Sequence, residues 1–347
     1  MDTKTNMRKI SIVIPCYNVD EYLDRCWDSL KKQEIGLDCL ECIFVNDGST
    51  DEGRTWNKLT EIEAQAPNSV MIINLPENSG QGEARNVGIM HATGKYLQFL
   101  DADDELKPEA LKTLYDLAEE NDTDIIQFNH LYVLNDQSRS SNSSKENRLF
   151  VIDSKKDRIP FLNTTKVTYG CTNKFYRLDL IKRSAVKFPA RMKYEEPLFV
   201  YPLFLYAKRV YLLNEELYIY YFRNGSTVTS QLGVRILDHP NVQLALLEYC
   251  MARKELFSEY RDIIEIYFLW TFYCETISYA GEYNALIPLE YFSSMQRICR
   301  DVFPKWRKNP YLSMIPKGGI SLLESIDLQF TSQAEVNDYI NKARNMI

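Results

Sequence analysis

Strand-length apolar runs alternate with helix-length amphipathic segments over the first 134 residues, and this alternation leaves few architectures open. Strands are predicted at Ile10–Pro15, Glu41–Asn46, Val70–Leu75, Lys95–Leu100 and Asp124–Leu134. Helices are predicted at Glu21–Lys32, about Glu52–Ala66, about Glu83–Ala92 and from near Pro108 onward. Such alternation indicates an α/β fold with a mostly parallel sheet flanked by helices, which binds ligands at the carboxyl ends of its strands.

The pattern changes further along the chain. Asp136–Asn147 contains no apolar residue and is predicted to be a mobile loop or hairpin tip. Short aromatic stretches follow, and beyond about residue 231 the apolar period becomes helical. We therefore expect a first domain over residues 1–230 and a helical domain over residues 231–347, which serves packing, dimerisation or contact with a membrane surface.

The charge balance narrows the classes of partner. The 347 residues carry 41 basic and 48 acidic side chains, a net charge of −7, so the surface has no general attraction for nucleic acid. The first apolar run, Ile10–Cys16, is too short for a signal peptide, and no stretch reaches the ~20 apolar residues of a membrane span. These features favour a cytoplasmic protein.

Three aspartates follow the fourth predicted strand in "YLQFLDADDEL". Asp101 and Asp103 are two apart, so their side chains lie on one side of an extended chain and repel each other unless a cation lies between them. Oxygen ligands without histidine or cysteine favour Mg²⁺ or Mn²⁺. The alternative is a solvated turn; in either case Asp104 and Glu105 are assigned to the N-terminus of the next helix.

Other strand ends add groups suited to a nucleotide. The first strand ends in "PCYN", the second in "VNDGSTD", and the third unit carries "NSGQGEARN". Tyr17 offers a flat face for a base, Asp47 an acceptor for a base N–H, and Arg85 a fork for a diphosphate. With a metal on Asp101 and Asp103, these groups form a nucleotide pocket.

Three familiar motifs do not fit. In "GQGEAR" a dinucleotide-binding Gly-x-Gly-x-x-Gly would need glycine where Arg85 stands, and it would follow the first strand directly. A phosphate-binding Walker A pattern and a Gly-x-Ser-x-Gly elbow are also absent from the sequence.

Four stretches in order, "ISIVIPCYN", "FVNDGSTD", "NSGQGEARNVGI" and "YLQFLDADD", closely resemble the signatures of family 2 glycosyltransferases. "TNKFYR", "KYEEPLF" and "YYFRNGST" are similar to three weaker family segments. The resemblance implies a GT-A fold and an inverting enzyme that uses nucleotide-activated sugars.

Residue roles follow from this resemblance. It implies that the donor is bound by Pro15, Tyr17, Asn18, Asp47, Ser49, Arg85, Asp101 and Ala102. It implies that Asp103 with Asp101 holds Mn²⁺ or Mg²⁺. The family's catalytic base is an aspartate where this chain has Glu196, so Glu196 is the expected base and the preceding Glu195 is the alternative.

The resemblance also implies partners. The expected donor is a UDP-sugar, and the expected acceptor is a saccharide or lipid-linked saccharide in capsule, exopolysaccharide or lipopolysaccharide synthesis at the inner membrane face. Two rival classes remain. A sugar nucleotidylyltransferase would need a Gly-rich loop with Arg and Lys where this chain has "PCYNVDEYL", and a non-catalytic binding scaffold would not need both acid pairs.

The remaining polar residues receive structural interpretations. His91 and His130 fall in a predicted helix and strand, and His239, before Pro240, is interpreted as a linker residue. A basic stretch around Trp306 is interpreted as packing or dimerisation surface, with membrane contact as the alternative; its members are Arg297, Arg300, Lys305, Arg307 and Lys308.

Overall fold

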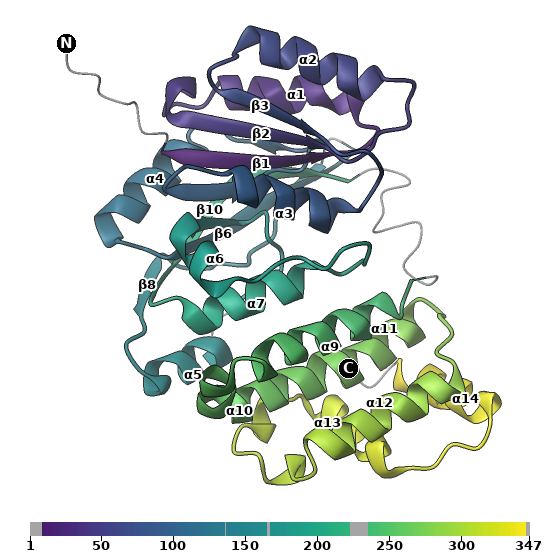
Figure 1. Cartoon of the computed structure of the whole chain (residues 1–347). Helices are drawn as coiled ribbons and strands as arrows, with labels where there is room; N and C mark the ends of the chain where they lie inside the picture. Colours follow the sequence, from purple (N-terminus) through teal and green to yellow (C-terminus); the bar gives the residue numbers. More distant parts are fainter. Residues whose placement is uncertain (1–8, 136, 165–166, 223–234, 345–347) are drawn as a thin grey trace. The chain divides into compact units, whose positions relative to one another are not determined.

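A computed structural model describes residues 9–135, 137–164, 167–222 and 235–344, and these divide into two compact units (Figure 1). The sheet unit comprises Met1–Met192 and Phe199–Arg223, and the helical unit comprises Lys193–Leu198 and Asn224–Ile347. The short segment Lys193–Leu198 therefore groups with the C-terminal part of the chain, although the residues that follow it directly, Phe199–Arg223, belong to the sheet unit. The domain boundary predicted near residue 231 lies outside the described residues.

The sheet unit is built on a ten-stranded sheet. Its main order is β3–β2–β1–β4–β9–β6–β10–β5, with β7 beside β6 and β8 beside β10. The strands are β1 Ile10–Cys16, β2 Leu40–Asn46, β3 Val70–Asn74, β4 Tyr96–Phe99, β5 Glu105–Leu106, β6 Ile125–Leu134, β7 Gln137–Ser140, β8 Arg148–Val151, β9 Lys174–Arg177 and β10 Arg209–Tyr221.

Helices connect these strands. They are α1 Asp20–Lys31, α2 Arg54–Gln65, α3 Gln81–His91, α4 Ala110–Asn121, α5 Lys155–Thr164, α6 Leu178–Ser184 and α7 Glu196–Tyr206, with a 3₁₀ turn at Leu37–Cys39. Every strand and helix predicted from the alternation is present, with ends displaced by at most two residues. The largest consequence is at α4, which begins at Ala110 and so does not include the acids before Pro108.

Helices on both faces explain why the central strands read as continuous apolar runs. Every residue of β1 is buried. Ile12 and Ile14 share a core cluster with Trp27 of α1. Val13 points to the opposite face, where α3 approaches so closely that a Cβ on Gly88 would lie 2.3 Å from the Val13 Cγ1 atom. Alternate residues of one strand thus hold helices on opposite faces.

The sheet is mixed beyond its first four strands. β1, β2, β3 and β4 pair in parallel, as the alternation predicts. β9 then lies antiparallel between β4 and β6, with Phe175 opposite both Gln98 and Ile126. Within the predicted Asp136–Asn147 loop, Gln137–Ser140 forms β7 and makes a hairpin with β6. Asp136 lies outside the described residues.

The helical unit contains α9 Asp238–Met251, α10 Lys254–Phe268, a π-helical segment Leu269–Glu275, α11 Thr276–Glu282, α12 Leu289–Val302, α13 Lys317–Glu324 and α14 Gln333–Ala343. Short 3₁₀ turns lie at Trp306–Lys308, Leu312–Met314 and Ser325–Asp327. Its core is aromatic: Phe268 stacks on Phe272 with ring centroids 4.5 Å apart. The helical character predicted for this part of the chain is confirmed, since within residues 235–344 helices are joined by short connections.

A buried acid in the helical unit makes stability depend on pH. The Glu275 Oε1 atom accepts a hydrogen bond from the Trp270 indole at 2.8 Å, and burial raises the pKa of Glu275 from 4.5 to about 7. Because the folded state holds this proton more tightly than the unfolded state, the contribution of Glu275 to the free energy of unfolding should fall as pH rises from about 4.5 through about 7. Glu275→Gln keeps an acceptor for Trp270 and should remove this contribution, which is measured as the difference between wild type and variant in urea unfolding across that range. The exposed Glu290→Gln should leave it unchanged.

Candidate functional site

The loops that follow β1 and β2 are tied together by side chains predicted to bind the donor. Asn18 takes a left-handed backbone conformation, with φ of 51°. Its N–H donates to the Ser49 hydroxyl at 3.1 Å, and its carboxamide oxygen accepts from the Thr50 N–H at 2.8 Å. Next to this junction Tyr17 is 41% exposed, whereas Pro15 is buried. The tyrosine ring is therefore accessible to a ligand at the end of β1.

Asp47 first serves to position the loop before α3. Its side chain is 1% exposed, and its two oxygens accept the N–H groups of Ser79 and Gly80, each at 2.8 Å. The neighbouring Gly48 has φ of +62°, and a Cβ there would lie 2.4 Å from the Glu77 carbonyl carbon. Both Asp47 oxygens are therefore engaged in holding this loop.

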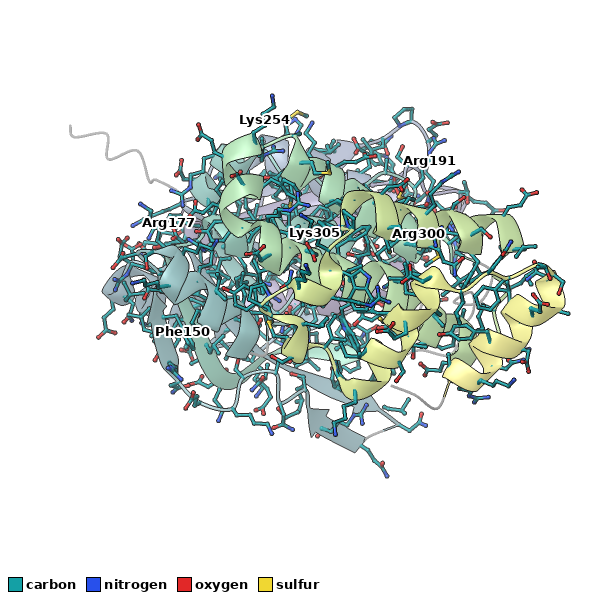
Figure 2. All side chains as sticks on the ribbon, turned by 90° about the horizontal axis from the view of Figure 1, so that it is seen from below. Phe150, Arg177, Arg191, Lys254, Arg300 and Lys305 are labelled. Carbon is teal, nitrogen blue, oxygen red and sulfur yellow. The ribbon has the colours of Figure 1, made fainter. Side chains whose placement is uncertain are left out.

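Arg191 holds the same loop from its other side. Its guanidinium pairs with the Glu77 carboxylate at 2.6 Å, and its backbone N–H donates a hydrogen bond to the Ser79 carbonyl at 3.2 Å. Arg191 is labelled in Figure 2 and has φ of 57°, an unusual conformation for a residue other than glycine. Loop Glu77–Gly80 is thus fixed by Asp47 and by Arg191, a residue that the sequence motifs did not single out.

Arg85 and Asp101 form a largely buried ion pair at the end of β4. The Arg85 Nη2 atom lies 2.9 Å from the Asp101 Oδ1 atom, and the Arg85 side chain is only 2% exposed. Gln81 donates to the same oxygen at 2.8 Å. The guanidinium lies near the rings of Phe99 and Phe188, at 6.0 and 5.4 Å from their centroids. Arg85 therefore neutralises Asp101, and this ion pair lies where a diphosphate is expected.

Asp104 serves a different purpose from the one predicted. It is 1% exposed, and its carboxyl oxygens accept the Tyr218 hydroxyl at 2.7 Å and the Tyr221 N–H at 3.0 Å. Burial, with a smaller contribution from Asp101, raises the pKa of Asp104 to about 8. The assignment of Asp104 to the next helix was wrong, because this acid instead fixes β10 against the end of β4.

Glu105 was also assigned to the next helix, and the structure corrects that assignment. It lies in β5, where its Oε1 atom is 3.4 Å from Arg25 Nε and accepts the Tyr221 hydroxyl at 2.7 Å. Arg25 also donates to the Asp103 carbonyl and stacks on the Tyr221 ring. The acidic stretch is thereby divided: Asp104 and Glu105 hold the sheet together, whereas the Asp101 carboxylate pairs with Arg85 and Gln81.

Asp101 and Asp103 are both partly exposed, and Ala102 between them is buried. Within the described ranges, no three His, Cys, Asp or Glu side chains are grouped to hold a metal ion. Two carboxylates fit a Mg²⁺ or Mn²⁺ ion whose other ligands are diphosphate oxygens and water, which is how magnesium commonly binds. The donor set is therefore compatible with a divalent ion that binds together with the nucleotide.

The predicted catalytic acids belong to the other unit. Glu196 is the first residue of α7, and Glu195 precedes it; both are partly exposed. They lie in the segment Lys193–Leu198 of the helical unit, whereas the donor residues named above belong to the sheet unit. The structure thus brings the predicted donor residues together and groups the predicted acid pair with the C-terminal helices. Arg223, in the third weaker family segment, lies outside the described residues.

The three histidines differ in burial and in their hydrogen-bond partners. His130 is buried, its Nε2 atom lies 3.0 Å from the Thr172 hydroxyl, and burial lowers its pKa to about 3. His91 is exposed, and its Nδ1 atom lies 2.9 Å from the Val87 carbonyl of the same helix. His239 was interpreted as a linker residue, but it lies inside α9 and is 4% exposed. That interpretation was wrong, because proline is tolerated in the first turn of a helix.

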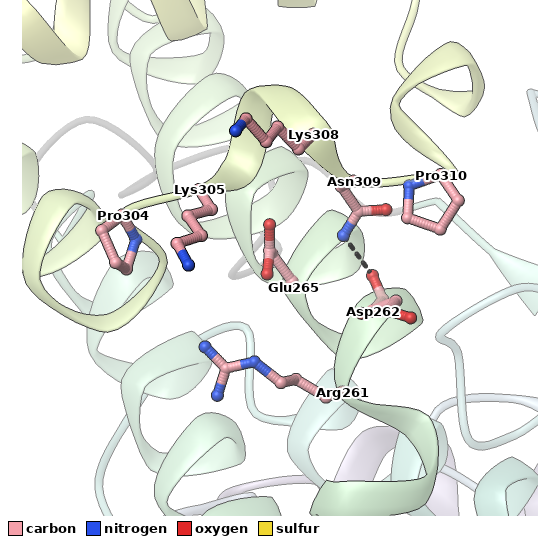
Figure 3. A pocket seen from close by; sticks show the side chains of 8 residues that line it. All are labelled: Arg261, Asp262, Glu265, Pro304, Lys305, Lys308, Asn309 and Pro310. Carbon is pink, nitrogen blue, oxygen red and sulfur yellow. Dashed lines mark hydrogen bonds between the residues drawn. The ribbon is translucent and has the colours of Figure 1, made fainter.

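A cavity of about 430 Å³ lies in the helical unit (Figure 3). None of the predicted donor or catalytic residues lines it; its lining is Arg261, Asp262, Glu265, Pro304, Lys305, Lys308, Asn309 and Pro310. Glu265 is 7% exposed and brings a carboxyl group among the three cationic side chains. This cavity is separate from the predicted chemistry.

The basic stretch around Trp306 is less available to a membrane than its sequence implies. Trp306 is 2% exposed, and Arg307 pairs with Glu324 at 2.5 Å and Asp327 at 2.8 Å. Lys305, labelled in Figure 2, remains exposed. None of the helices in the described parts of the chain is long and apolar enough to cross a bilayer.

The mixed α/β sheet has the GT-A fold of glycosyltransferases, to judge by a solved structure of that class described below. The chain belongs to glycosyl transferase family 2, whose family model matches residues 11–184. The fold and the enzyme class expected from the sequence are thereby confirmed.

Known proteins support this assignment. The chain is 31% identical over 263 residues to the uncharacterized glycosyltransferase YibD of Escherichia coli, covering 75% of this chain and 74% of YibD. It is 32% identical over 217 residues to a poly(ribitol-phosphate) beta-glucosyltransferase of Bacillus spizizenii, covering 62% of this chain and 32% of that protein. A crystal structure of S. aureus TarS 1-349 in complex with UDP-GlcNAc has a TM-score of 0.60 at 20% identity, covering 97% of this chain and 90% of TarS 1-349.

Proposed function

We propose that this protein transfers a sugar, with inversion, from a UDP-sugar to a hydroxyl of a saccharide or lipid-linked saccharide acceptor. The observation that carries the proposal is the convergence of Tyr17, Asp47, Arg85 and Asp101 at the carboxyl ends of parallel strands. Two relatives support the choice of substrate: one is named for glucosyl transfer to poly(ribitol-phosphate), and TarS was crystallised with UDP-GlcNAc.

The donor base would be held by the loops after β1 and β2. The exposed Tyr17 ring provides a stacking surface, and Asp47 would act by holding Ser79 and Gly80 in place beside the base. Asn18 and Ser49 are already hydrogen-bonded to each other, so these loops are ordered before the donor binds. Such preorganisation lowers the entropic cost of binding.

The diphosphate would lie beside the Arg85–Asp101 pair. The buried Arg85 guanidinium holds the Asp101 carboxylate in place, and groups fixed in advance stabilise a leaving group without a reorganisation cost. Asp103 with Asp101 would hold Mn²⁺ or Mg²⁺, which supplies further positive charge to the departing diphosphate.

Glu196 would act as the base. It takes the proton of the acceptor hydroxyl while that oxygen forms a bond to the anomeric carbon of the sugar. The bond from that carbon to the diphosphate oxygen breaks on the opposite face, so UDP leaves with the electron pair and the configuration inverts. Glu195 is the alternative base, as the sequence left open.

The proposed acceptor class is the one that the family resemblance implies, and the relative named for poly(ribitol-phosphate) supports a cell-surface polymer in general. We place the reaction in the synthesis of bacterial-type surface polysaccharide, at the cytoplasmic face of the membrane. The exposed basic residues of the helical unit, such as Lys305 and Lys308, offer contacts for anionic lipid, and dimerisation through this unit is the competing use of its surface.

A nucleotide screen tests this proposal. UDP with Mn²⁺ at about 100 times its Kd should stabilise the protein by about 2.7 kcal/mol, which raises Tm by about 2–4 °C. CDP and GDP should give smaller shifts, and EDTA should reduce the UDP shift. In parallel, donor hydrolysis should be detected with at least one UDP-sugar. A non-catalytic scaffold predicts the thermal shift without hydrolysis, and no shift with any nucleotide would contradict the donor site itself.

A further inference from the structure

The segment that carries the acid pair is docked on the first turn of α9. The Lys193 N–H donates a hydrogen bond to the Asp238 Oδ2 atom at 2.9 Å. The same Asp238 oxygen lies 2.7 Å from the Arg235 guanidinium. Asp238 begins a 14-residue helix, so it is a firm anchor for the chain just before Glu196.

Tyr194 makes the second contact. Its ring stands edge-on against the His239 imidazole, with centroids 5.4 Å apart and planes at 89°. Its backbone has φ of 59°, in the left-handed region that only glycine adopts without strain. Such a conformation persists only where the surroundings hold it, and the contacts of Lys193 and Tyr194 with α9 provide that restraint.

His239 is itself fixed in place. Its Nδ1 atom lies 2.8 Å from the Thr276 hydroxyl, and the Tyr279 ring packs edge-on against it at 5.1 Å. Its Nε2 atom faces the Glu275 carboxyl at 3.8 Å. Burial lowers the pKa of His239 to about 4, so the imidazole is neutral at neutral pH. It therefore acts as a rigid packing surface between α11 and Tyr194.

We propose that Asp238 and His239 are positioning residues for the transfer reaction. They hold Lys193 and Tyr194, and through them they set the place and direction of the Glu196 carboxylate. This inference rests on the proposed function, in which Glu196 is the base. It assigns the helical unit a part in catalysis that is separate from donor binding.

This inference predicts that donor binding and removal of the acceptor proton can be impaired separately. The donor nucleotide contacts residues of the sheet unit, so loosening the Lys193–Tyr194 contacts should leave donor affinity unchanged. Removal of the acceptor proton depends on where Glu196 lies, and a displacement of about 1 Å can cost about 100-fold in rate. A purely structural role for Asp238 and His239 predicts instead a loss of stability without this separation.

Tyr194→Ala is the first test, with Tyr194→Phe as its matched control. Alanine removes the ring that contacts His239, and phenylalanine retains it. We expect Tyr194→Ala to lower kcat by about 10- to 100-fold, with the donor KM and the UDP Kd within about twofold of wild type. Tyr194→Phe should retain near wild-type kcat. Val336→Ala, which removes buried side-chain volume in α14, controls for a general loss of stability in the helical unit.

The second test asks whether Tyr194 acts through Glu196. In a Glu196→Gln background, Tyr194→Ala should add less than about a twofold further loss, because the group it positions is already inactive. An equal loss in both backgrounds would overturn the proposal, as would an equal fall in kcat for Val336→Ala.

A third measurement does not depend on activity. Amide hydrogen exchange of Lys193 should accelerate in Asp238→Ala and remain near wild type in Asp238→Asn, whose amide oxygen still accepts the Lys193 N–H. Unchanged exchange in Asp238→Ala would refute the contact. If the wild-type protein shows no transfer or hydrolysis with any donor, the proposed function fails, while the exchange result still decides whether α9 holds the segment.

Discussion

Glu196→Gln is expected to lower the rate of sugar transfer by about 10²- to 10⁴-fold, the usual contribution of a positioned general base. Glutamine preserves the size of the side chain but cannot accept the acceptor proton. Because Glu196 belongs to the helical unit and the donor residues to the sheet unit, UDP affinity should stay close to wild type. Steady-state kinetics with the best donor, together with calorimetry with UDP, would measure both effects.

Glu195→Gln is the matched control for this experiment. It removes one negative charge from the same segment and should retain most activity if Glu196 is the base. Inactive Glu195→Gln with fully active Glu196→Gln would reverse the assignment. Equal, small losses in both variants would show that neither carboxylate takes the proton.

Asp103→Asn is expected to remove the metal-dependent part of donor binding and to lower transfer by about 10²- to 10³-fold, the scale seen when one group that stabilises the transition state is removed. Asparagine is a poorer ligand for Mg²⁺ or Mn²⁺ because it lacks the charge of the carboxylate. The measurement is the Tm shift produced by UDP in Mn²⁺ and in EDTA. In this variant the two shifts should become nearly equal.

The exposed Asp116→Asn in α4 controls for the loss of one surface charge and should behave as wild type. Asp101→Asn is a less selective variant, since it leaves the buried Arg85 guanidinium without its carboxylate partner and should also lower stability. A Tm shift for Asp103→Asn that still depends on Mn²⁺ would show that the ion, if it binds, uses other ligands.

The sheet unit was largely predictable because its strands bury both faces and its helices bury one. Runs such as Ile10–Pro15 are continuous in sequence, and period alone separates them from Glu21–Lys32. β9 and β7 escaped prediction, since neither belongs to the alternation of strands and helices on which the prediction rested. β4 also has four residues, but it was recognised because it lies within that alternation.

The roles of the acids were predictable only where the partners are local or the family signature is strong. Asp104 is fixed by Tyr218 and Tyr221, which lie 114 and 117 residues further on, so a sequence reading assigned it to the nearest helix instead. Asp47 has the predicted place at the end of β2, but its bonds to Ser79 and Gly80 depend on how a loop 32 residues later folds back.

His239 shows the same difficulty for the helical unit. The His-Pro dipeptide resembles a linker, and only tertiary packing against Thr276 and Tyr194 shows otherwise. In sequence, the dipeptide fits the start of a helix as well as a linker, because proline is tolerated in the first turn of a helix. Pro240 lies in the first turn of α9.

The position of β9 has a consequence for synthesis of the chain. β4 and β6 are joined only through β9, and the other side of β6 pairs with β10. During synthesis, β1 to β4 are therefore made long before β9 and β10, which complete the sheet. The early part includes Tyr17, Asp47, Arg85 and Asp101. Until Lys174–Arg177 is made, β4 has an open edge with free N–H and C=O groups, which is the kind of surface that pairs with other chains. The nascent protein thus has the strand ends that carry the proposed donor residues before it has the strand that covers the edge of β4.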